Sequence, residues 1–351
     1  MSPYKATTRD IASLFKKLPA RKPSKSKPHL RALHDTRERV GSIHVRSNVT
    51  RIPKVQKRRG KEKQRALVFE VEKEFPKPGR KTWYGYAFDG NLPPAPHAFD
   101  SATMDLVLVD DCTWDTYDSF EKENLVVVDK DTGSLVLAKL SKRQCKDLNK
   151  VWNVARDFLP TVRKWKDCIT RTVDGMKMYC FGYRKNPKDD QLGQYSFKPN
   201  CSPKHAKLIS DFVVGLTKEM FKKAKPMCSR LPEFKKMCQA VGKFNMSTLG
   251  GTVFTQFGCG FEYWSHAHTD SDFFYTLLGG LATDGKKDVV LYYFVFPEYG
   301  IKVPMKDGDL MFFDPLQYHC CTNQSRPKKN LIFSGYSSNK SVATDTVNKN
   351  K

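Results

Sequence analysis

The chain has 351 residues, of which 39% are hydrophobic, and it includes 23 Phe and 14 Tyr. This apolar content is enough to bury a sizeable core, which excludes a chain that is disordered throughout. The length allows one large domain or two ordinary ones. The formal net charge of +24 favours negatively charged partners such as nucleic acids.

The positive charge is concentrated near the N-terminus. Residues 1–65 carry 20 Lys and Arg against four Asp and Glu, a net +16, whereas the other 286 residues carry 41 against 33, a net +8. Because the segment is rich in Lys, Arg, Pro and Ser and has little apolar periodicity, we predict a largely disordered arm. Such an arm attracts nucleic acid by neutralising phosphates and releasing counterions. A solubilising tail, or a nuclear-import address at 54–61, is the alternative.

Nothing in the sequence predicts secretion or a membrane span. The N-terminal segment has only a short apolar patch, and no run approaches the ~20 apolar residues that a span needs. The ten cysteines form no C-x-x-C pair, and the adjacent Cys320 and Cys321 are poor disulfide candidates, so a reducing interior fits best. We expect a nuclear or cytoplasmic protein, without a structural zinc site, and infer no obligate protein partner.

From residue 66 onward the sequence is that of a folded domain. Apolar, β-branched runs predict strands at 66–71, 105–109, 125–129 and 134–138. Asp131-Thr132-Gly133 predicts a hairpin turn between the last two. The Pro- and Gly-bearing stretch 76–98 is predicted to be a loop. Ser141 as an N-cap and apolar residues at helical spacing predict a helix from 142 to about 166, with a break at Pro160.

Further along, the pattern changes from helical to β. Weak periodicity at 172–200 predicts a long loop, and amphipathic spacing predicts helices at 203–223 and 231–241. Short strands separated by turn residues are then predicted at 252–257, 273–278, 289–296, 300–303, 309–313 and 330–334. Together, the predicted helices and strands indicate an α+β domain at 66–340, in which the helices pack on one sheet of a sandwich or barrel. A flexible tail is predicted at 341–351.

The sharpest motif is His268-Thr269-Asp270. On an extended segment, residues at i and i+2 point to the same side, so one imidazole and one carboxylate can reach one ion. His319 lies 49 residues beyond Asp270, after the Asp307-Gly308 turn and the predicted strand at 309–313. Two histidines and one carboxylate on one face leave three positions open, as in the facial triad of non-haem Fe(II) oxygenases. We predict His268, Asp270 and His319 as metal ligands and catalytic centre.

A rival ligand set is the H-x-H pair of His266 with His268, which would suit zinc or a cupin-like site. The mixed nitrogen and oxygen set of the triad suits Fe(II) better than the thiolate-rich sets that zinc favours.

A 2-oxo acid cosubstrate would need a cation for its distal carboxylate on the strand after the distal histidine. Arg326, Lys328 and Lys329 are near enough in sequence. Lys329 is the preferred candidate because it is ten residues past His319 and opens the strand at 330–334. Arg326 is the reserve, since an Arg fork grips a carboxylate more rigidly than a Lys point charge. A solvated basic loop is the alternative.

The segment from His268 to Tyr336 resembles the 2-oxoglutarate/Fe(II) oxygenases, and most of all their TET/JBP branch, which oxidises the methyl group of 5-methylpyrimidines in DNA. His268-Thr269-Asp270, the 307–313 approach, His319 and Lys329 carry this resemblance. The hairpin at 128–135 is also similar to small protist and fungal members of the branch. The resemblance implies a double-stranded β-helix core of the jelly-roll or cupin-like type at about 245–340, with flanking helices.

The resemblance further implies an Fe(II)- and 2-oxoglutarate-dependent dioxygenase acting on 5-methylcytosine or thymine in DNA. A base within a duplex would have to be flipped out and stacked on aromatic side chains. Phe261, Tyr263, Trp264 and the loop 179–195 are candidates, with ordinary core packing as the alternative for each. Lys329 stands where the branch usually has Arg, which leaves ascorbate, associated with some algal relatives, as an alternative cosubstrate.

Two other functions compete. A prolyl or lysyl hydroxylase of the same fold would share every iron ligand, and a non-catalytic nucleic-acid-binding module would have a decayed triad. The +16 arm favours DNA, bound through the arm and the surface of the catalytic domain, because a protein hydroxylase has no evident need for such charge.

Overall fold

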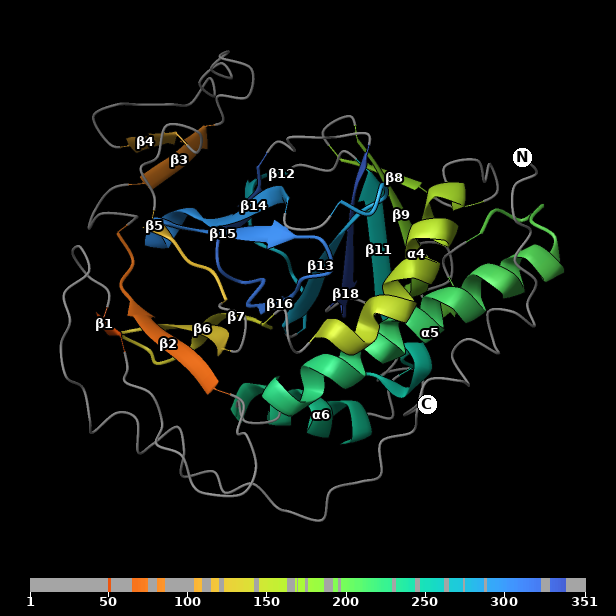
Figure 1. The fold of residues 1–351 in the computed structure, drawn as a ribbon, viewed down its shortest axis with the longest axis horizontal. Coiled ribbons are helices and arrows are strands. Elements are labelled where there is room, and N and C mark those ends of the chain that lie inside the picture. Colours follow the sequence, from red (N-terminus) through yellow and green to blue (C-terminus); the bar gives the residue numbers. More distant parts are fainter. Residues whose placement is uncertain are drawn as a thin grey trace.

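A computed structural model gives the arrangement of the chain (Figure 1). The structure describes residues 50–51, 65–74, 81–85, 104–108, 115–119, 123–141, 145–162, 168, 170–173, 176–185, 192–194, 197–228, 232–243, 247–261, 265–273, 275–286, 289–322 and 329–338. The predicted tail at 341–351 and most of the predicted arm lie outside the described residues. Within the arm, β1 (Thr50–Arg51) pairs with β2 (Arg65–Val71), which begins at the last arm residue.

Eight consecutive strands form the core. They are β11 (Gln256–Phe261), β12 (Ser265–His268), β13 (Thr276–Ala282), β14 (Val290–Phe296), β15 (Ile301–Lys306), β16 (Leu310–Phe313), β17 (His319–Cys321) and β18 (Asn330–Tyr336). The larger sheet has the order β16-β13-β18-β11 and the smaller sheet the order β12-β17-β14-β15. The chain thus passes repeatedly from one sheet to the other, with antiparallel pairing throughout. This topology is a double-stranded β-helix, which confirms the predicted fold class.

The strands that precede the core widen its sheets. Beyond β16 the larger sheet continues through β7 (Leu135–Lys139), β6 (Glu123–Asp129), β2 and β1, and beyond β11 through β9 (Met176–Lys185), β8 (Thr170–Val173) and β10 (Leu192–Gln194). The smaller sheet gains β5 (Asp115–Thr116), while β3 (Lys81–Gly85) and β4 (Met104–Leu108) pair separately. The basic arm therefore joins the fold at one end of the larger sheet.

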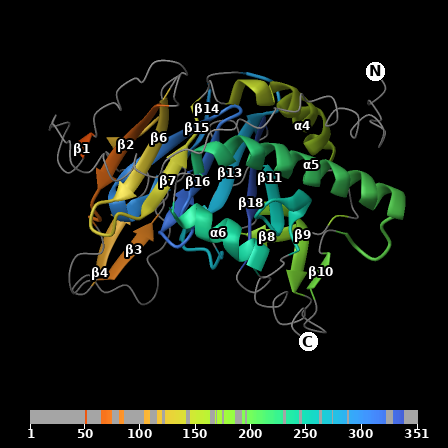
Figure 2. The same cartoon turned by 90° about the horizontal axis from the view of Figure 1, so that it is seen from below.

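Three helices cover the larger sheet on the face away from the smaller one (Figure 2). They are α4 (Asn149–Val162), α5 (Pro203–Cys228) and α6 (Pro232–Lys243). The predicted packing of helices on one sheet is confirmed, but the break at Pro160 is wrong, because α4 continues to Val162. No helix in the described part of the chain is long and apolar enough to cross a membrane.

Alternation along the strands of the larger sheet supplies two apolar cores. On β13, Leu277 and Leu281 face the helices, whereas Leu278 and Ala282 face the smaller sheet. All four are buried, and full burial of a large apolar side chain stabilises the fold by roughly 1.5–3 kcal/mol. The larger sheet is therefore the middle layer of three, which holds its strands firmly.

Two predicted loops contain strands. β3 lies inside 76–98, β9 and β10 lie inside 172–200, and β8 overlaps the start of that second stretch. β9 pairs with β11 from Gln256↔Gly182 to Gly260↔Met178, so neighbouring strands supply an order that local composition does not show. The predicted strands at 252–257 and 273–278 were placed too early, and β12 and β17 were not predicted.

The turn between β15 and β16 is fixed by the helix layer. Gly308 has a φ of 81°, and a Cβ there would lie 3.0 Å from Trp152 Nε1. Asp307 accepts hydrogen bonds from the Ala282 amide (2.8 Å) and from an Arg156 guanidinium nitrogen (2.5 Å). Because this turn leads through β16 toward the metal-ligand candidate His319, α4 helps to position that side of the core.

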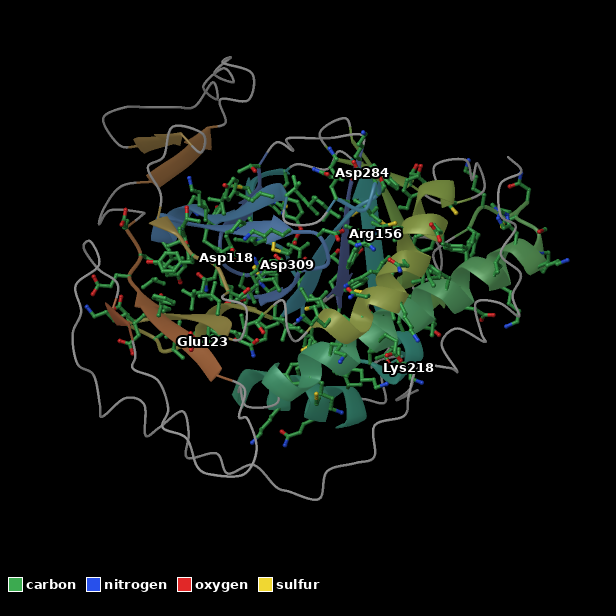
Figure 3. All side chains as sticks on the ribbon, in the orientation of Figure 1. Asp118, Glu123, Arg156, Lys218, Asp284 and Asp309 are labelled. Carbon is green, nitrogen blue, oxygen red and sulfur yellow. The ribbon has the colours of Figure 1, made fainter. Side chains whose placement is uncertain are left out.

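A buried charge network joins β7 to the same turn. The Lys139 ammonium is fully buried and lies 2.6 Å from Asp118 Oδ1, 2.7 Å from Asp309 Oδ2 and 2.5 Å from the Pro304 carbonyl oxygen (Asp118 and Asp309 are labelled in Figure 3). Lys306 reaches the other oxygen of Asp118 at 2.8 Å. Burial raises the pKa of Asp309, which the charge of Lys139 partly offsets. Three partners for three N–H groups leave the ammonium satisfied.

We predict that Lys139→Met lowers the free energy of unfolding by roughly 3–5 kcal/mol, because it leaves the buried Asp309 carboxylate without its counter-charge. Lys306→Met is the matched control and should cost at most about 1 kcal/mol, since the Lys306 side chain is 36% exposed. Urea unfolding followed by circular dichroism measures both. Equal effects of the two variants would contradict a structural role for the buried ammonium.

Candidate metal centre

An irregularity in strand pairing brings the two histidines face to face. Ser265 pairs with Cys321 and His268 pairs with His319, so β12 uses three steps where β17 uses two. A bulge of this kind re-aims the side chains that follow it. Without it, His268 would lie on the opposite face of the sheet from His319, because side chains alternate along a strand. With it, the two imidazole centroids are 4.6 Å apart.

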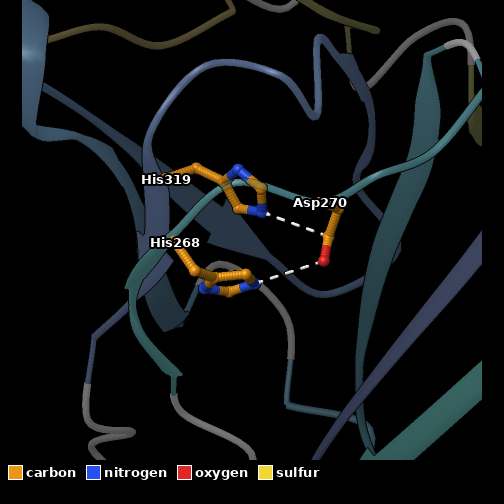
Figure 4. Close-up of side chains that lie close together, drawn as sticks. All are labelled: His268, Asp270 and His319. Atoms are coloured by element: carbon orange, nitrogen blue, oxygen red, sulfur yellow. Dashed lines mark ion pairs between the residues drawn. The ribbon is translucent and has the colours of Figure 1, made fainter.

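Asp270 completes the group just beyond the end of β12. Its backbone N–H donates to the Pro315 carbonyl oxygen at 2.8 Å, which ties it to the segment that leads into His319. One carboxylate oxygen lies 3.6 Å from His268 Nε2 and the other lies 3.4 Å from His319 Nε2 (Figure 4). One ligand atom from each residue lies within 4.8 Å of the other two. The structure thus brings together the three residues that the sequence predicts as metal ligands.

His319 is held in one orientation and one tautomer. Its Nδ1 lies 2.8 Å from the Gln317 carbonyl oxygen. Because a carbonyl only accepts, Nδ1 carries a proton, which leaves Nε2, on the side of Asp270, as the ring atom that can bind a metal ion. The ring stacks on Phe294 at 5.4 Å and meets Phe313 edge-on at 4.8 Å. Such a fixed outer hydrogen bond is typical of metal-binding histidines.

The spacing and chemistry of the three side chains fit a first-row metal ion. Bonds of about 2.0–2.2 Å at right angles to one another place ligand atoms roughly 3 Å apart, and the ion-pair distances of 3.4 and 3.6 Å are close to this. His319 is buried, whereas the side chains of His268 and Asp270 are 37% and 44% exposed. A bound ion would therefore have protein on one side and open positions on the other.

A second carboxyl group lies close behind the site. Asp272 is buried and accepts a hydrogen bond from the Thr276 hydroxyl at 2.9 Å. Burial, followed by the neighbouring negative charge of Asp270, raises the pKa of Asp272 to about 7. Two adjacent carboxyl groups repel each other when both are ionised, so a cation held by Asp270 would stabilise this pair.

A hydrogen-bonded chain links the hairpin of β6 and β7 to His319. The Tyr299 hydroxyl lies 2.9 Å from Asp129 Oδ2 and 3.1 Å from Gln317 Oε1, so its one proton is shared between two acceptors. The Gln317 amide nitrogen donates to Asp314 at 3.0 Å. Gln317 is therefore held at its side chain while its carbonyl orients His319.

The structure does not bring the candidate cosubstrate cation Lys329 together with the triad. Asn330 points between the sheets and donates to the Leu291 carbonyl oxygen at 2.9 Å, so the preceding Lys329 projects away from that space. The Lys329 side chain is 58% exposed, with Nζ 3.8 Å from Asp284 (labelled in Figure 3). Lys329 also precedes the first residue of β18, whereas the segment after Asp270 contacts the other end of that strand. There the Ser337 carbonyl oxygen accepts from the Phe273 amide. Binding of a cosubstrate by Lys329 stays a prediction, and Arg326 and Lys328 lie outside the described residues.

Of the aromatic residues suggested for base stacking, Phe261 and Tyr179 are buried in the apolar core beneath the helices. The segment around Tyr179 is strand β9, not a loop. Tyr263, Trp264 and the side chain of the rival ligand His266 lie outside the described part of the structure.

Comparisons with known proteins give likenesses of structure only. No protein-family model matches the chain, and no curated protein matches it in sequence. Among solved structures, it is similar to NgTET1 in complex with 5mC DNA, with a TM-score of 0.42, 13% identity, and coverage of 65% of this chain and 84% of that one. It is also similar to an oxidoreductase of the 2OG-Fe(II) oxygenase family from Burkholderia pseudomallei (TM-score 0.36, 7% identity, 57% and 85% covered). A third likeness is to AviO1 from Streptomyces viridochromogenes (TM-score 0.26, 12% identity, 58% and 90% covered). The functional assignment therefore depends on the residues of this chain.

Sequence reasoning missed the supporting residues around the triad. Asp272 had a visible signal, since it repeats the i, i+2 spacing after Asp270. Tyr299 had none, because it supports the centre through a contact with Gln317, 18 residues further along the chain; the Gln317 carbonyl had none either, because a backbone group bonded to His319 is not marked by residue type.

We predict that the protein binds one divalent first-row ion and that His319→Ala or Asp270→Ala weakens this binding by at least about 100-fold, beyond the 10–100-fold effect of outer partners. Isothermal titration with Co(II) or Mn(II) measures the affinity. His266→Ala should bind as the wild type does. A large loss in His266→Ala, with Asp270→Ala unaffected, would instead establish the H-x-H ligand set.

We also predict that Tyr299→Phe weakens metal binding by about tenfold, because Gln317 loses the contact that fixes it beside His319. The free energy of unfolding should fall by only about 1 kcal/mol, the usual value of one hydrogen bond. Co(II) absorption spectra and titrations report the site directly. Tyr293→Phe, which alters the outer face of the smaller sheet, is the control. An unchanged Co(II) affinity in Tyr299→Phe would remove Tyr299 from the support of the centre.

Proposed function

We propose that the chain is a non-haem Fe(II) dioxygenase dependent on 2-oxoglutarate, which oxidises the methyl group of 5-methylcytosine, or thymine, in DNA. The observation that carries the proposal is the convergence of His268, Asp270 and His319 within a double-stranded β-helix, with ligand atoms within 4.8 Å of one another. Two imidazoles and one carboxylate on one face are the donor set of Fe(II) oxygenases that keep open positions for cosubstrate and dioxygen.

Three residues of the chain would bind the metal ion, and the residues around them would shape its surroundings. His268 Nε2, His319 Nε2 and one oxygen of Asp270 would hold the ion. When bound, Fe(II) together with 2-oxoglutarate supplies the oxidising chemistry with dioxygen. Phe294 and Phe313 pack around His319, which excludes water from the inner side of the centre. The exposed sides of His268 and Asp270 leave the outer side as the approach for a substrate.

DNA as the substrate is supported by charge and by the sequence resemblance. The net +16 of residues 1–65 gives a polyanion a large electrostatic attraction, and these residues enter the fold at the edge of the larger sheet through β2. The sequence from His268 to Tyr336 resembles the TET/JBP branch, whose members act on 5-methylpyrimidines. We infer a nuclear location from this substrate and from the import-like run at 54–61.

For the distal carboxylate of 2-oxoglutarate, we propose Arg326 and Lys329 as the candidate cations. Because Lys329 projects away from the space between the sheets, toward Asp284, we expect the larger contribution from Arg326. Arg also offers the two-pronged geometry that a carboxylate prefers.

We predict that the protein with Fe(II) and 2-oxoglutarate converts 5-methylcytosine in duplex DNA to products that carry at least one additional oxygen atom, and that His319→Ala abolishes the conversion. Mass spectrometry of digested DNA measures it. Arg326→Gln should raise the KM for 2-oxoglutarate more than Lys329→Gln does.

Replacing 2-oxoglutarate with ascorbate in a parallel reaction separates the two cosubstrates. Unchanged DNA under both conditions, with succinate still formed when Pro- or Lys-containing peptides are added, would replace this proposal with a protein hydroxylase. No turnover at all, despite intact metal binding, would leave only a binding module.

A further inference from the structure

Two exposed apolar side chains border the metal centre. Among the described residues, Leu316 and Tyr318 stand out as large hydrophobic side chains in solvent, at 62% and 40% exposure. Both belong to the short segment between β16 and β17, and Tyr318 immediately precedes His319. We call these two side chains the apolar lip. Their position beside a ligand of the candidate centre sets them apart from scattered surface residues.

The segment that bears the lip is firmly held. Asp314 Oδ1 accepts from the Leu316 amide at 3.0 Å, and its other carboxylate oxygen accepts from the Gln317 side chain at 3.0 Å. The Gln317 backbone N–H donates to the Asp314 carbonyl oxygen at 3.2 Å, and the Pro315 carbonyl oxygen accepts from the Asp270 backbone N–H. Leu316 and Tyr318 are thus exposed on a segment that the protein pins in place. Because the backbone of this segment is already ordered, covering the two side chains costs little backbone entropy.

The lip faces outward because its neighbours face inward. Gln317 and His319 are turned into the protein, toward Tyr299 and the aromatic packing around the centre, and the residues between and before them point the other way. In Figure 4 the ribbon that enters His319 lies next to Asp270. Since the Pro315 carbonyl oxygen, next to Leu316, accepts from the Asp270 amide and the side chains of His268 and Asp270 are partly exposed, the lip lies beside exposed ligands of the candidate centre.

We propose that Leu316 and Tyr318 contact the substrate and that, on the proposed function, the substrate they contact is a nucleic-acid duplex. The Tyr318 ring stacks on a base, and Leu316 occupies the space that the target base leaves when it turns toward the metal. Aromatic rings stack on any base because every base has a π face, and apolar wedges are a common means of opening a base step. The inference rests on the proposed function and assigns its substrate contacts.

Charge and size favour a duplex over another protein copy. The chain carries a net charge of +24, so two copies repel each other while a polyanion is attracted. Two side chains also form a much smaller patch than the roughly 1,000 Å² that a stable protein interface needs. A base step, in contrast, is of the size that one ring and one aliphatic side chain can cover.

The test uses the full chain loaded with Co(II), which binds without turnover, and a duplex that carries one 5-methylcytosine beside a 2-aminopurine. Fluorescence anisotropy gives the affinity, 2-aminopurine emission reports unstacking, and the Co(II) absorption spectrum reports the metal centre. The variants are Tyr318→Ala and Leu316→Ser, with Tyr318→Phe and Leu316→Met as matched controls that keep the ring and the apolar bulk.

We expect Tyr318→Ala to bind the duplex roughly tenfold more weakly, the size of one lost base–aromatic stack, and Leu316→Ser to reduce the 2-aminopurine signal at saturation. Tyr318→Phe and Leu316→Met should behave as the wild type does, and all Co(II) spectra should coincide.

Three results would overturn the assignment, each in a different way. If the wild type binds the duplex and both disruptive variants match it, the lip has no substrate contact while the proposed function stands. If Tyr318→Ala changes the Co(II) spectrum, the residue acts through His319 instead of through the substrate. If the wild type neither binds the duplex nor unstacks the base, the DNA substrate and the lip fall together.

Discussion

The pairing of β12 with β17 across one extra residue is the constraint on which the candidate centre depends. Ser265 lies opposite Cys321, and the added step then turns His268 toward His319. Neither histidine could reach a common ion without this shift, because side chains on a regular strand alternate between faces. The bulge is held in place because the smaller sheet packs on the larger sheet. The larger sheet is buried by helices on one face and by the smaller sheet on the other.

Around this pairing, the segment from Asp314 to His319 has two faces with different roles. Its inner face orients His319 through the Gln317 carbonyl and reaches the β6–β7 hairpin through Tyr299. Its outer face carries the exposed Leu316 and Tyr318. One short connection therefore joins the support of the candidate metal centre to the surface that we propose as a substrate contact. A shift of this segment would move both.

The sequence was most informative where chemistry and local spacing coincide. His268-Thr269-Asp270, the glycine turn at 307–309 and the distal His319 could be recognised because residue type and spacing already define a ligand set. The amphipathic stripes of α5 and α6 were equally plain. These features depend on residues near one another in the chain.

What escaped prediction depends on partners far away in sequence. β9 lies in a stretch of mixed composition and is ordered by β11, whose paired residues lie 74 to 82 positions further along the chain. The bulge in β12 leaves no mark in Ser265-His266-Ala267-His268. Lys329 matches the expected spacing from His319, yet the inward turn of Asn330 directs it outward. Spacing along the chain predicts which residues are near each other, but strand alternation decides which way each one faces.

The pairing of β11 with β18 gives the core a closed outline. Gln256, the first residue of β11, is the direct partner of Tyr336, the last residue of β18. The polypeptide therefore enters and leaves the eight-stranded unit at one place, and all three metal-ligand candidates lie between these two points. The residues before β11 are joined to that unit by one covalent passage, by sheet edges and by the helices that cover the larger sheet. In evolutionary terms, such a unit can acquire or lose a charged arm at the outer strands of its sheet, while the geometry around the ion is preserved. Side chains also cross that division, since Lys139 reaches Asp309, Arg156 reaches Asp307 and Tyr299 reaches Asp129, and these contacts make the folded segment before β11 and the eight-stranded unit a matched pair.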